Sequence, residues 1–143
     1  MNQNLDQNPK LLYTARAHTT GGRERGITRS ADGLLDLRLS TPGSSRIGTN
    51  PEQLLAAGWS ACFESSLAIA ARKRDIVLPA DTSIDAEVDL KLADDGYFLS
   101  VRLNVRLQGI ERGIVKALVD EAHRICPYSK ATAGNISVAI NLV

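Results

Sequence analysis

Two stretches in the second half of the chain alternate between apolar and polar residues at every position, 84–92 and 99–107. A period of two places the apolar side chains on one face, which is typical of a half-buried strand. An Asp-Asp-Gly turn at 94–96 lies between them, so we predict a long hairpin. A similar alternation over residues 136–142 predicts a last strand.

The first fifty residues contain shorter strand patterns. They predict strands at 12–20, 27–30 and 35–39. A Gly-Gly pair breaks the chain after the first of these strands, and an Asp-Gly turn joins the other two in a hairpin. Proline, glycine and serine over residues 41–49 predict a loop. The polar residues at the start of the chain (1–10) are expected to form a flexible tail.

The clearest helix start lies at Asn50 and Pro51. Asn50 is a good N-cap, Pro51 suits the first helical position, and Gln53 stands where it can close a capping box. The helix is predicted to run from Pro51 to about Arg74, and its first two-thirds is small and apolar on most sides. Such a pattern is typical of a buried helix.

A second helix is predicted over residues 110–125, and Pro127 is expected to end it. The order of elements is strands, long helix, strand pair, second helix and strand. This order indicates an α+β fold, with antiparallel β-sheets packed on a long buried central helix plus the second helix. A length of 143 residues fits one domain, so we expect residues 1–143 to form a single domain.

Composition and charge exclude several classes of protein. Hydrophobic residues make up 43% and charged residues 23%, which is the balance of a folded domain and not of a disordered chain. The formal net charge is +1 and aromatic residues are scarce, so no nucleic-acid partner is expected. No apolar run approaches the roughly 20 residues of a membrane span, and no signal segment is visible. We therefore expect a cytoplasmic protein without a membrane partner.

The two cysteines, Cys62 and Cys126, are candidate chemical groups. A structural disulfide is not expected in the reducing cytoplasm, and neither cysteine belongs to a C-x-x-C pair. Each is therefore either a small core residue or a reactive thiol. Cys62 lies among small residues, where a bulkier apolar side chain is the usual core filler. Cys126 stands at a helix end before a polar run, where we expect its side chain to be accessible.

A reactive cysteine must reach its thiolate form, because the thiolate is the nucleophile. Burial in an apolar helix disfavours the thiolate, and Cys62 lies about three turns from the helix N-terminus, too far to gain much from the helix dipole. A nearby cation is therefore required. Lowering the pKa by about two units would make the thiolate the major form at neutral pH. A guanidinium suits this task because it stays charged when desolvated.

Three parts of the chain, residues 12–23, 48–63 and 126–136, resemble motifs of the organic hydroperoxide resistance (Ohr) proteins, which share a superfamily with the osmotically induced OsmC proteins. The signature around the reactive cysteine of that family is similar to residues 48–63, GTNPEQLLAAGWSACF. The signature around its second cysteine is similar to residues 126–136, CPYSKATAGNI. Its opening strand and arginine loop resemble residues 12–15 and 20–23. The order and spacing agree over nearly the whole chain past the tail, and the motifs favour the Ohr branch.

The resemblance implies a thiol-dependent peroxidase that reduces alkyl and fatty-acid hydroperoxides and protects against organic peroxide stress. Cys62 would be the peroxidatic cysteine, and Cys126 would resolve its sulfenic acid as an intramolecular disulfide. Arg23 would activate the thiolate, and Glu52 would hold Arg23. The resemblance further implies an intertwined homodimer with active sites at the interface, no metal or organic cofactor, and reduction by a lipoylated protein or other dithiol.

Glu52 and Cys62 are ten residues apart in sequence, which is about 15 Å along an unbroken helix. One arginine cannot meet both on a single straight helix. Either the helix breaks at Gly58, or Arg23 and Glu52 come from the partner chain. We favour the partner chain, because a shared site also explains so apolar a helix in so small a domain.

The sequence departs from the family pattern around the arginine loop. The glycine that follows this loop comes one residue late, at Gly26, and the loop at 41–47 is poorer in glycine than usual. The resemblance therefore leaves the path of the arginine loop open, and Arg25 and Arg46 are rivals for the role of Arg23. Taken alone, Glu52 is most simply an acidic residue at a helix start, where the dipole favours it.

Alternatives from other classes also stay open. His123 and Cys126 are three residues apart on a predicted helix and could present a metal site, with Cys62 as a third ligand. A non-enzymatic role on the same fold is a second alternative. An OsmC-like preference for other peroxides is a third.

Overall fold

The computed structural model describes residues 8–143, so most of the predicted tail, residues 1–7, lies outside the described residues. Residues 8–10 are exposed and belong to no helix or strand. The described chain divides into two compact units, the first ending at Leu54 and the second beginning at Leu55. Each unit contains its own sheet.

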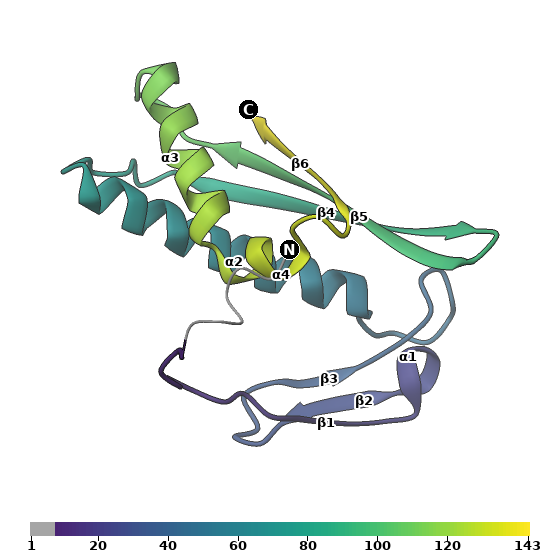
Figure 1. The fold of residues 1–143 in the computed structure, drawn as a ribbon. Helices are drawn as coiled ribbons and strands as arrows, with labels where there is room; N and C mark the ends of the chain where they lie inside the picture. The colour runs from purple at the N-terminus through teal and green to yellow at the C-terminus, as the bar shows by residue number, and fades with distance from the viewer. Residues whose placement is uncertain (1–7) are drawn as a thin grey trace. The chain divides into compact units, whose positions relative to one another are not determined.

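The sheet of the first unit is antiparallel, with the order β1-β2-β3 (Figure 1). Its strands are β1, Ala17–Thr20, β2, Ile27–Ser30, and β3, Asp36–Arg38, with a one-turn helix α1, Gly22–Arg25, between β1 and β2. The predicted Asp-Gly turn between β2 and β3 is confirmed. Asp32 accepts hydrogen bonds from the Ser30 hydroxyl and the Leu34 N–H, and Gly33 has a φ of 75°, which favours glycine.

The strand predicted at 12–20 is shorter than expected and begins at Ala17. Its partner β2 ends at Ser30, which pairs with Ala17. Residues 12–15 therefore lack a neighbouring strand within the described part of the chain, and Leu12 and Tyr13 are exposed. A strand needs a partner for its backbone groups, which the local pattern alone does not reveal.

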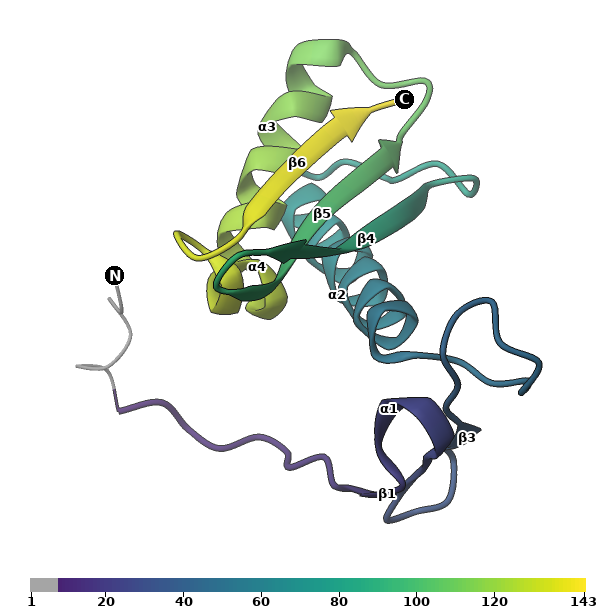
Figure 2. The same cartoon turned by 90° about the vertical axis from the view of Figure 1, so that its right-hand side faces the viewer.

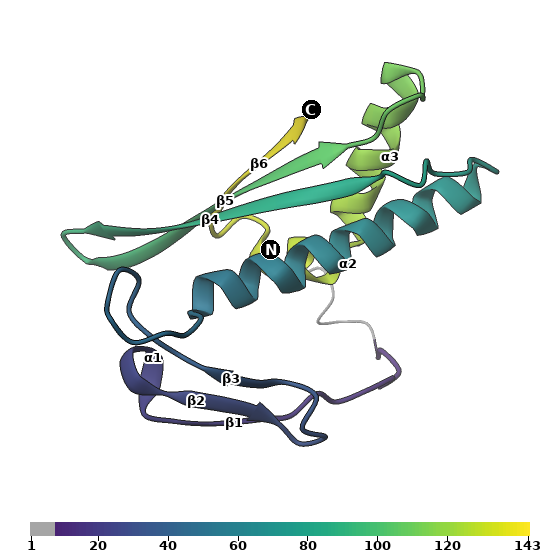
Figure 3. The ribbon, with the colours of Figure 1, turned by 180° about the vertical axis from the view of Figure 1, so that it is seen from behind.

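Helix α2, Pro51–Lys73, matches the predicted long helix and continues through Gly58 without a break (Figure 3). The hypothesis of a break at Gly58 is therefore wrong. Asn50 caps the helix as predicted, because its side-chain oxygen accepts the Gln53 N–H at 2.9 Å. The capping box itself does not close, since the Gln53 side chain instead accepts from the Thr49 hydroxyl at 2.6 Å.

The sheet of the second unit contains the predicted hairpin and last strand. Its strands are β4, Ser83–Ala93, β5, Gly96–Arg106, and β6, Ser137–Leu142, in the order β4-β5-β6. β4 and β5 are antiparallel, but β6 runs parallel to β5, so the expectation of antiparallel sheets is wrong for this strand. The chain crosses over through two helices between β5 and β6, and such a crossover brings a strand back in the parallel sense.

Helices α3, Arg112–Ile125, and α4, Pro127–Thr132, form this crossover. Pro127 ends α3 as predicted, but it also begins α4, which the sequence pattern did not predict. α2 and α3 lie on the same face of the sheet (Figure 2). The core between them is apolar and comes from α2 (Trp59, Phe63, Leu67), β5 (Val101, Leu103, Val105) and α3 (Val115, Leu118, Val119, Ala122). The predicted α+β arrangement is confirmed.

The buried carboxylate of Glu121 ties α3 to the end of α2. It accepts Lys73 Nζ at 3.1 Å and also pairs with the Arg74 guanidinium. Hydrogen bonds from Arg74 and then Lys73 hold the pKa of Glu121 below its ordinary value. These contacts fix α3 on α2, and Cys126 directly follows the last residue of α3.

One face of α2 is buried within the chain, whereas Ala57, Ala61, Ser65 and Ile69 are exposed at intervals of four residues. The prediction of a helix buried on most sides is therefore wrong for the single chain. α2 is also long and apolar enough to cross a membrane, by length and composition alone, and 33% of its most apolar stretch is buried. The expectation that no segment reaches this size is corrected, although core helices of soluble proteins pass the same test.

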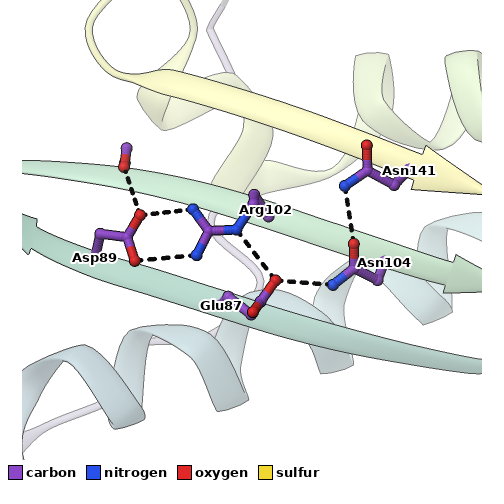
Figure 4. Close-up of polar contacts among 6 residues, drawn as sticks. Glu87, Asp89, Arg102, Asn104 and Asn141 are labelled. Carbon is purple, nitrogen blue, oxygen red and sulfur yellow. Dashed lines mark hydrogen bonds and ion pairs between the residues drawn. The ribbon is translucent and has the colours of Figure 1, made fainter.

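The outer face of the second sheet carries a connected set of polar side chains (Figure 4). Arg102 on β5 donates two hydrogen bonds to Asp89 on β4, at 2.6 and 3.0 Å, and one to Glu87 at 3.1 Å. Asn104 donates to Glu87 and accepts from Asn141 on β6. This set crosses all the strands of the sheet.

Candidate active site

The two cysteines are direct neighbours in the second unit. Cys62 lies on α2 and is half-buried, whereas Cys126 is fully buried where α3 meets α4. Both are free thiols, and the Cys126 thiol is a hydrogen-bonding neighbour of the Cys62 thiol. Residues 64 positions apart in sequence are thus brought together. The expectation that Cys126 is accessible is wrong, because its side chain is packed in the apolar core of the second unit.

The surroundings of Cys62 oppose its ionisation. Burial raises the pKa of the Cys62 thiol, and the neighbouring Cys126 thiol raises it further, while the Tyr128 backbone N–H acts in the opposite direction. A thiol with a raised pKa stays protonated at neutral pH. Within the described second unit, the two sulfurs are thus brought together in surroundings that favour the protonated form of Cys62.

The turn that carries Cys126 is docked on α2 through Tyr128. The Tyr128 ring stacks on Trp59, with 6.2 Å between the ring centroids. The Tyr128 side chain also lies so close to Gly58 that a Cβ on Gly58 would stand 2.6 Å from the Tyr128 hydroxyl oxygen. Gly58 therefore lets the Cys126 turn lie close to α2 and does not break the helix.

Ser129 links the three helices around the cysteines. Its buried hydroxyl oxygen accepts the Trp59 indole N–H at 3.3 Å and lies 2.9 Å from His123 Nδ1. A hydroxyl has one hydrogen to donate and two lone pairs, so Ser129 can bond to both Trp59 and His123 Nδ1 at once. Burial lowers the pKa of His123, which agrees with a neutral ring.

These contacts bear on the proposed metal site. His123 uses Nδ1 on Ser129, and no group of three or more His, Cys, Asp or Glu side chains within residues 8–143 could hold a metal ion. His123 is thus satisfied by a hydroxyl neighbour. Trp59, Tyr128 and Ser129 escaped prediction as site residues, although two of them belong to the run that follows Cys126.

Arg23 and Glu52 meet in the first unit. Arg23, on α1, donates to Glu52, in the first turn of α2, at 2.7 Å. The Glu52 side chain is 14% exposed and that of Arg23 is 42% exposed. The hydrogen bond from Arg23 holds the pKa of Glu52 below its ordinary value despite the opposing effect of burial. The carboxylate stays ionised and can orient the guanidinium.

Arg46, one of the two rivals of Arg23, has a different environment. Its guanidinium donates to the backbone carbonyls of Leu39, Arg25 and Gly26. The structure thus assembles two pairs, Cys62 with Cys126 and Arg23 with Glu52, each within its own unit.

Comparison with known proteins places the chain in a family. The family model described as OsmC-like protein matches residues 42–141. The chain is 44% identical, over 93% of its length and 96% of the relative, to an organic hydroperoxide resistance protein of Xanthomonas axonopodis pv. citri. The chain belongs to the organic hydroperoxide resistance branch of the OsmC-like family. The resemblance inferred from the three motifs is confirmed.

Solved structures of Ohr proteins agree with this assignment. The organic hydroperoxide resistance protein OhrB of Bacillus subtilis superposes with a TM-score of 0.87 at 38% identity, covering 93% of this chain and 100% of that one. An organic hydroperoxide resistance protein OsmC from Legionella pneumophila gives a TM-score of 0.86 at 42% identity, covering 93% and 98%. The Ohr fold therefore extends over nearly the whole chain.

Proposed function

We propose that this protein is a thiol-dependent peroxidase that reduces organic hydroperoxides to alcohols and protects against organic peroxide stress. The observation that carries the proposal is the direct neighbourhood of the Cys62 and Cys126 thiols, with Cys62 the more exposed of the two. A pair of thiols in contact, one open to solvent and one buried, is suited to attack and then resolution. The names of relatives in Xanthomonas and Bacillus, organic hydroperoxide resistance proteins, support the substrate class.

The proposed reaction has three balanced steps. The Cys62 thiolate attacks one oxygen of the hydroperoxide, the O–O bond breaks, and the departing alkoxide takes a proton to leave as the alcohol. The Cys62 sulfenic acid then condenses with the Cys126 thiol, forming a disulfide and releasing water. A dithiol reductant, for which we propose a lipoylated protein, transfers two electrons and two protons to restore both thiols and becomes a disulfide itself.

Arg23 and Glu52 are assigned to activation of Cys62. Because the pKa of Cys62 is raised, a nearby cation is needed to stabilise its thiolate. The Arg23 guanidinium can be that cation, since the ionised Glu52 carboxylate holds it in place. Because α2 is unbroken, Glu52 and Cys62 of one chain stand about 15 Å apart along the helix. We therefore assign the Arg23–Glu52 pair of one protomer to the cysteines of its partner in an intertwined homodimer.

The exposed small and apolar residues of α2 support the homodimer, because a helix of this composition is stabilised when a partner covers it. In this proposal the whole chain acts as one cytoplasmic domain, and neither a metal nor an organic cofactor takes part. The oxidising and reducing equivalents all pass through sulfur.

The proposal is tested by counting thiols before and after one equivalent of tert-butyl hydroperoxide. The native protein should lose both thiols as an intramolecular disulfide. Cys126→Ser should lose its one thiol and accumulate a sulfenic acid on Cys62 that dimedone traps. Cys62→Ser should keep the thiol of Cys126, because Cys126 is buried. Consumption of peroxide by Cys62→Ser at the native rate would refute the assignment.

A further inference from the structure

The loop between β3 and α2 folds back on itself. Its two ends are joined by backbone hydrogen bonds, from the Ser40 N–H to the Thr49 carbonyl at 2.9 Å and from the Thr49 N–H to the Arg38 carbonyl at 2.8 Å. Leu39 and Thr49 form a parallel bridge at the same place. Residues 41–48 therefore form a closed loop, and Arg46 lies on it.

Arg46 reaches from this loop to the end of α1. Its Nε donates to the Leu39 carbonyl at 3.0 Å, and one Nη donates to the Arg25 and Gly26 carbonyls at 3.3 Å each. Arg25 is the last residue of α1, and Gly26 follows it. Carbonyls at the C-terminal end of a helix lack partners within the helix, and the guanidinium supplies a donor to the last carbonyl of α1 and to the one that follows it.

α1 needs such outside support. It is a single turn of four residues, and so short a helix is not stable by itself in water. Its exit is also tightly packed, because a Cβ on the buried Gly26 would lie 2.0 Å from the Gly22 carbonyl oxygen. The Leu39 N–H donates to the Gly26 carbonyl at 2.8 Å from the other side. The end of α1 is thus held between the Leu39 backbone, directly after β3, and the Arg46 side chain.

We propose that Arg46 is a positioning residue, which holds α1 in the place where Arg23 meets Glu52. The inference rests on the proposed role of the Arg23–Glu52 pair in activating Cys62. Arg46 does not itself replace Arg23 as the activating cation, since its donors are directed to backbone carbonyls. The planar guanidinium matters as much as its charge, because its donors diverge to three carbonyls, a geometry that a lysine ammonium does not reproduce.

Two measurements on Arg46→Met test this role. The first is an NMR titration of the Glu52 carboxyl. Its pKa should rise towards the ordinary glutamate value, because displacement of α1 removes Arg23, whose hydrogen bond lowers that pKa. The second is the rate constant for Cys62 oxidation by tert-butyl hydroperoxide, which should fall about tenfold, equivalent to about 1.4 kcal/mol of transition-state stabilisation.

Matched variants separate positioning from charge and from general damage. Arg38→Met removes an exposed arginine of β3 from the same unit and should leave both measurements unchanged. Arg46→Lys keeps the charge and should give intermediate values, which also covers a failure of Arg46→Met to fold. Arg46→Met added to Arg23→Met should cause little further loss of rate, because two residues that act through one contact are not additive.

An unchanged Glu52 pKa in folded Arg46→Met would overturn the inference, and so would rate losses that multiply in the double variant. Failure of the proposed function looks different. If Arg23→Met itself leaves the oxidation rate unchanged, the assigned role of Arg23 is wrong, while the Glu52 titration still decides whether Arg46 positions the pair.

Discussion

At the scale of single residues, Gly58 sets how closely the Cys126 turn approaches α2. The Tyr128 side chain occupies the space where a larger residue at position 58 would place its Cβ. The same side chain stacks on Trp59, and the Tyr128 N–H faces the Cys62 sulfur. The distance between the two sulfurs therefore depends on a contact that contains neither of them.

Gly58→Ala should separate the two chemical steps. Alanine is favoured over glycine in a helix by about 1 kcal/mol, so the helix itself is not weakened. The added Cβ would lie 2.6 Å from the Tyr128 hydroxyl oxygen, so the Tyr128 side chain must shift, which disturbs the stacking on Trp59 that docks the turn. We expect disulfide formation to slow about tenfold, or about 1.4 kcal/mol, with the first oxidation of Cys62 near the native rate. Time-resolved dimedone trapping with mass spectrometry measures both steps.

Tyr128→Phe provides the matched control for this prediction. It removes the hydroxyl that the new Cβ would meet, so the Gly58→Ala, Tyr128→Phe pair should recover part of the lost rate. Equal disulfide rates in Gly58→Ala and the native protein would show that the Tyr128 contact does not position Cys126.

Sequence reasoning at this scale singled out the two cysteines as candidate reactive groups but did not predict their packing. Cys62 and Cys126 stand out because the motifs around them carry the family resemblance. The expected exposure of Cys126 was wrong because its burial depends on packing against residues far from it in sequence, such as Trp59, whose indole N–H donates to Ser129 on α4. Arg46 was recognised as a rival cation, while its contacts with carbonyls became visible in the fold.

At the scale of elements, the two sheets show which features local patterns determine. The hairpin of β4 and β5 was predictable because strict alternation and an adjacent turn specify both strands and their pairing. The parallel pairing of β6 was not, since it depends on the path of a crossover through α3 and α4. The absent strand at residues 12–15 has the same cause, because a strand pattern does not say where its partner lies.

The polar set on the outer face of the second sheet gives a pH-dependent prediction (Figure 4). Hydrogen bonds from Arg102, then Ser100, lower the pKa of Asp89 from 3.8 to about 2. A carboxyl with a depressed folded-state pKa stabilises the fold above its unfolded pKa, and this contribution is lost as the pH falls through the folded value. The loss should therefore occur between about pH 4 and pH 2.

Urea unfolding over this range checks the prediction. The free energy of unfolding of Asp89→Asn should be lower than that of the native protein at pH 6, and the difference should shrink as the pH falls to 2. Asp85→Asn makes the same change of charge on the same strand and leaves the bidentate pair of Asp89 and Arg102 intact. A difference for Asp89→Asn that is constant with pH would contradict the role of this ion pair.

At the scale of the whole molecule, the composition of α2 is consistent with the proposed interface between two protomers. Helical periodicity indicated a helix buried on most sides, whereas the single chain covers one face and leaves Ala57, Ala61, Ser65 and Ile69 exposed. In the proposed homodimer a partner would cover this exposed row, so part of the burial that the sequence pattern predicts would lie outside the single chain. This explains why the existence of the helix was predictable and its surroundings were not.

Ser65→Arg should therefore prevent the proposed homodimer, because a large charged side chain would stand in the exposed row of small residues. Sedimentation equilibrium should show a native mass of twice 15.4 kDa and a monomer for the variant. Peroxidase activity should fall with the mass, since each site is proposed to need Arg23 of the other protomer. Ala80→Arg, an equally large change in an exposed turn, should remain dimeric and active. A fully active monomer would end the shared-site hypothesis.

The full burial of Cys126 also determines where an incoming reductant can attack. If the disulfide keeps the burial of the two thiols, Cys126 is shielded and Cys62 is the more exposed of the two residues. The first mixed disulfide must then form on Cys62, with Cys126 as the leaving thiolate. Electrons would enter and leave the protein through a single atom, and any molecule that regenerates it must fit the same opening as the peroxide.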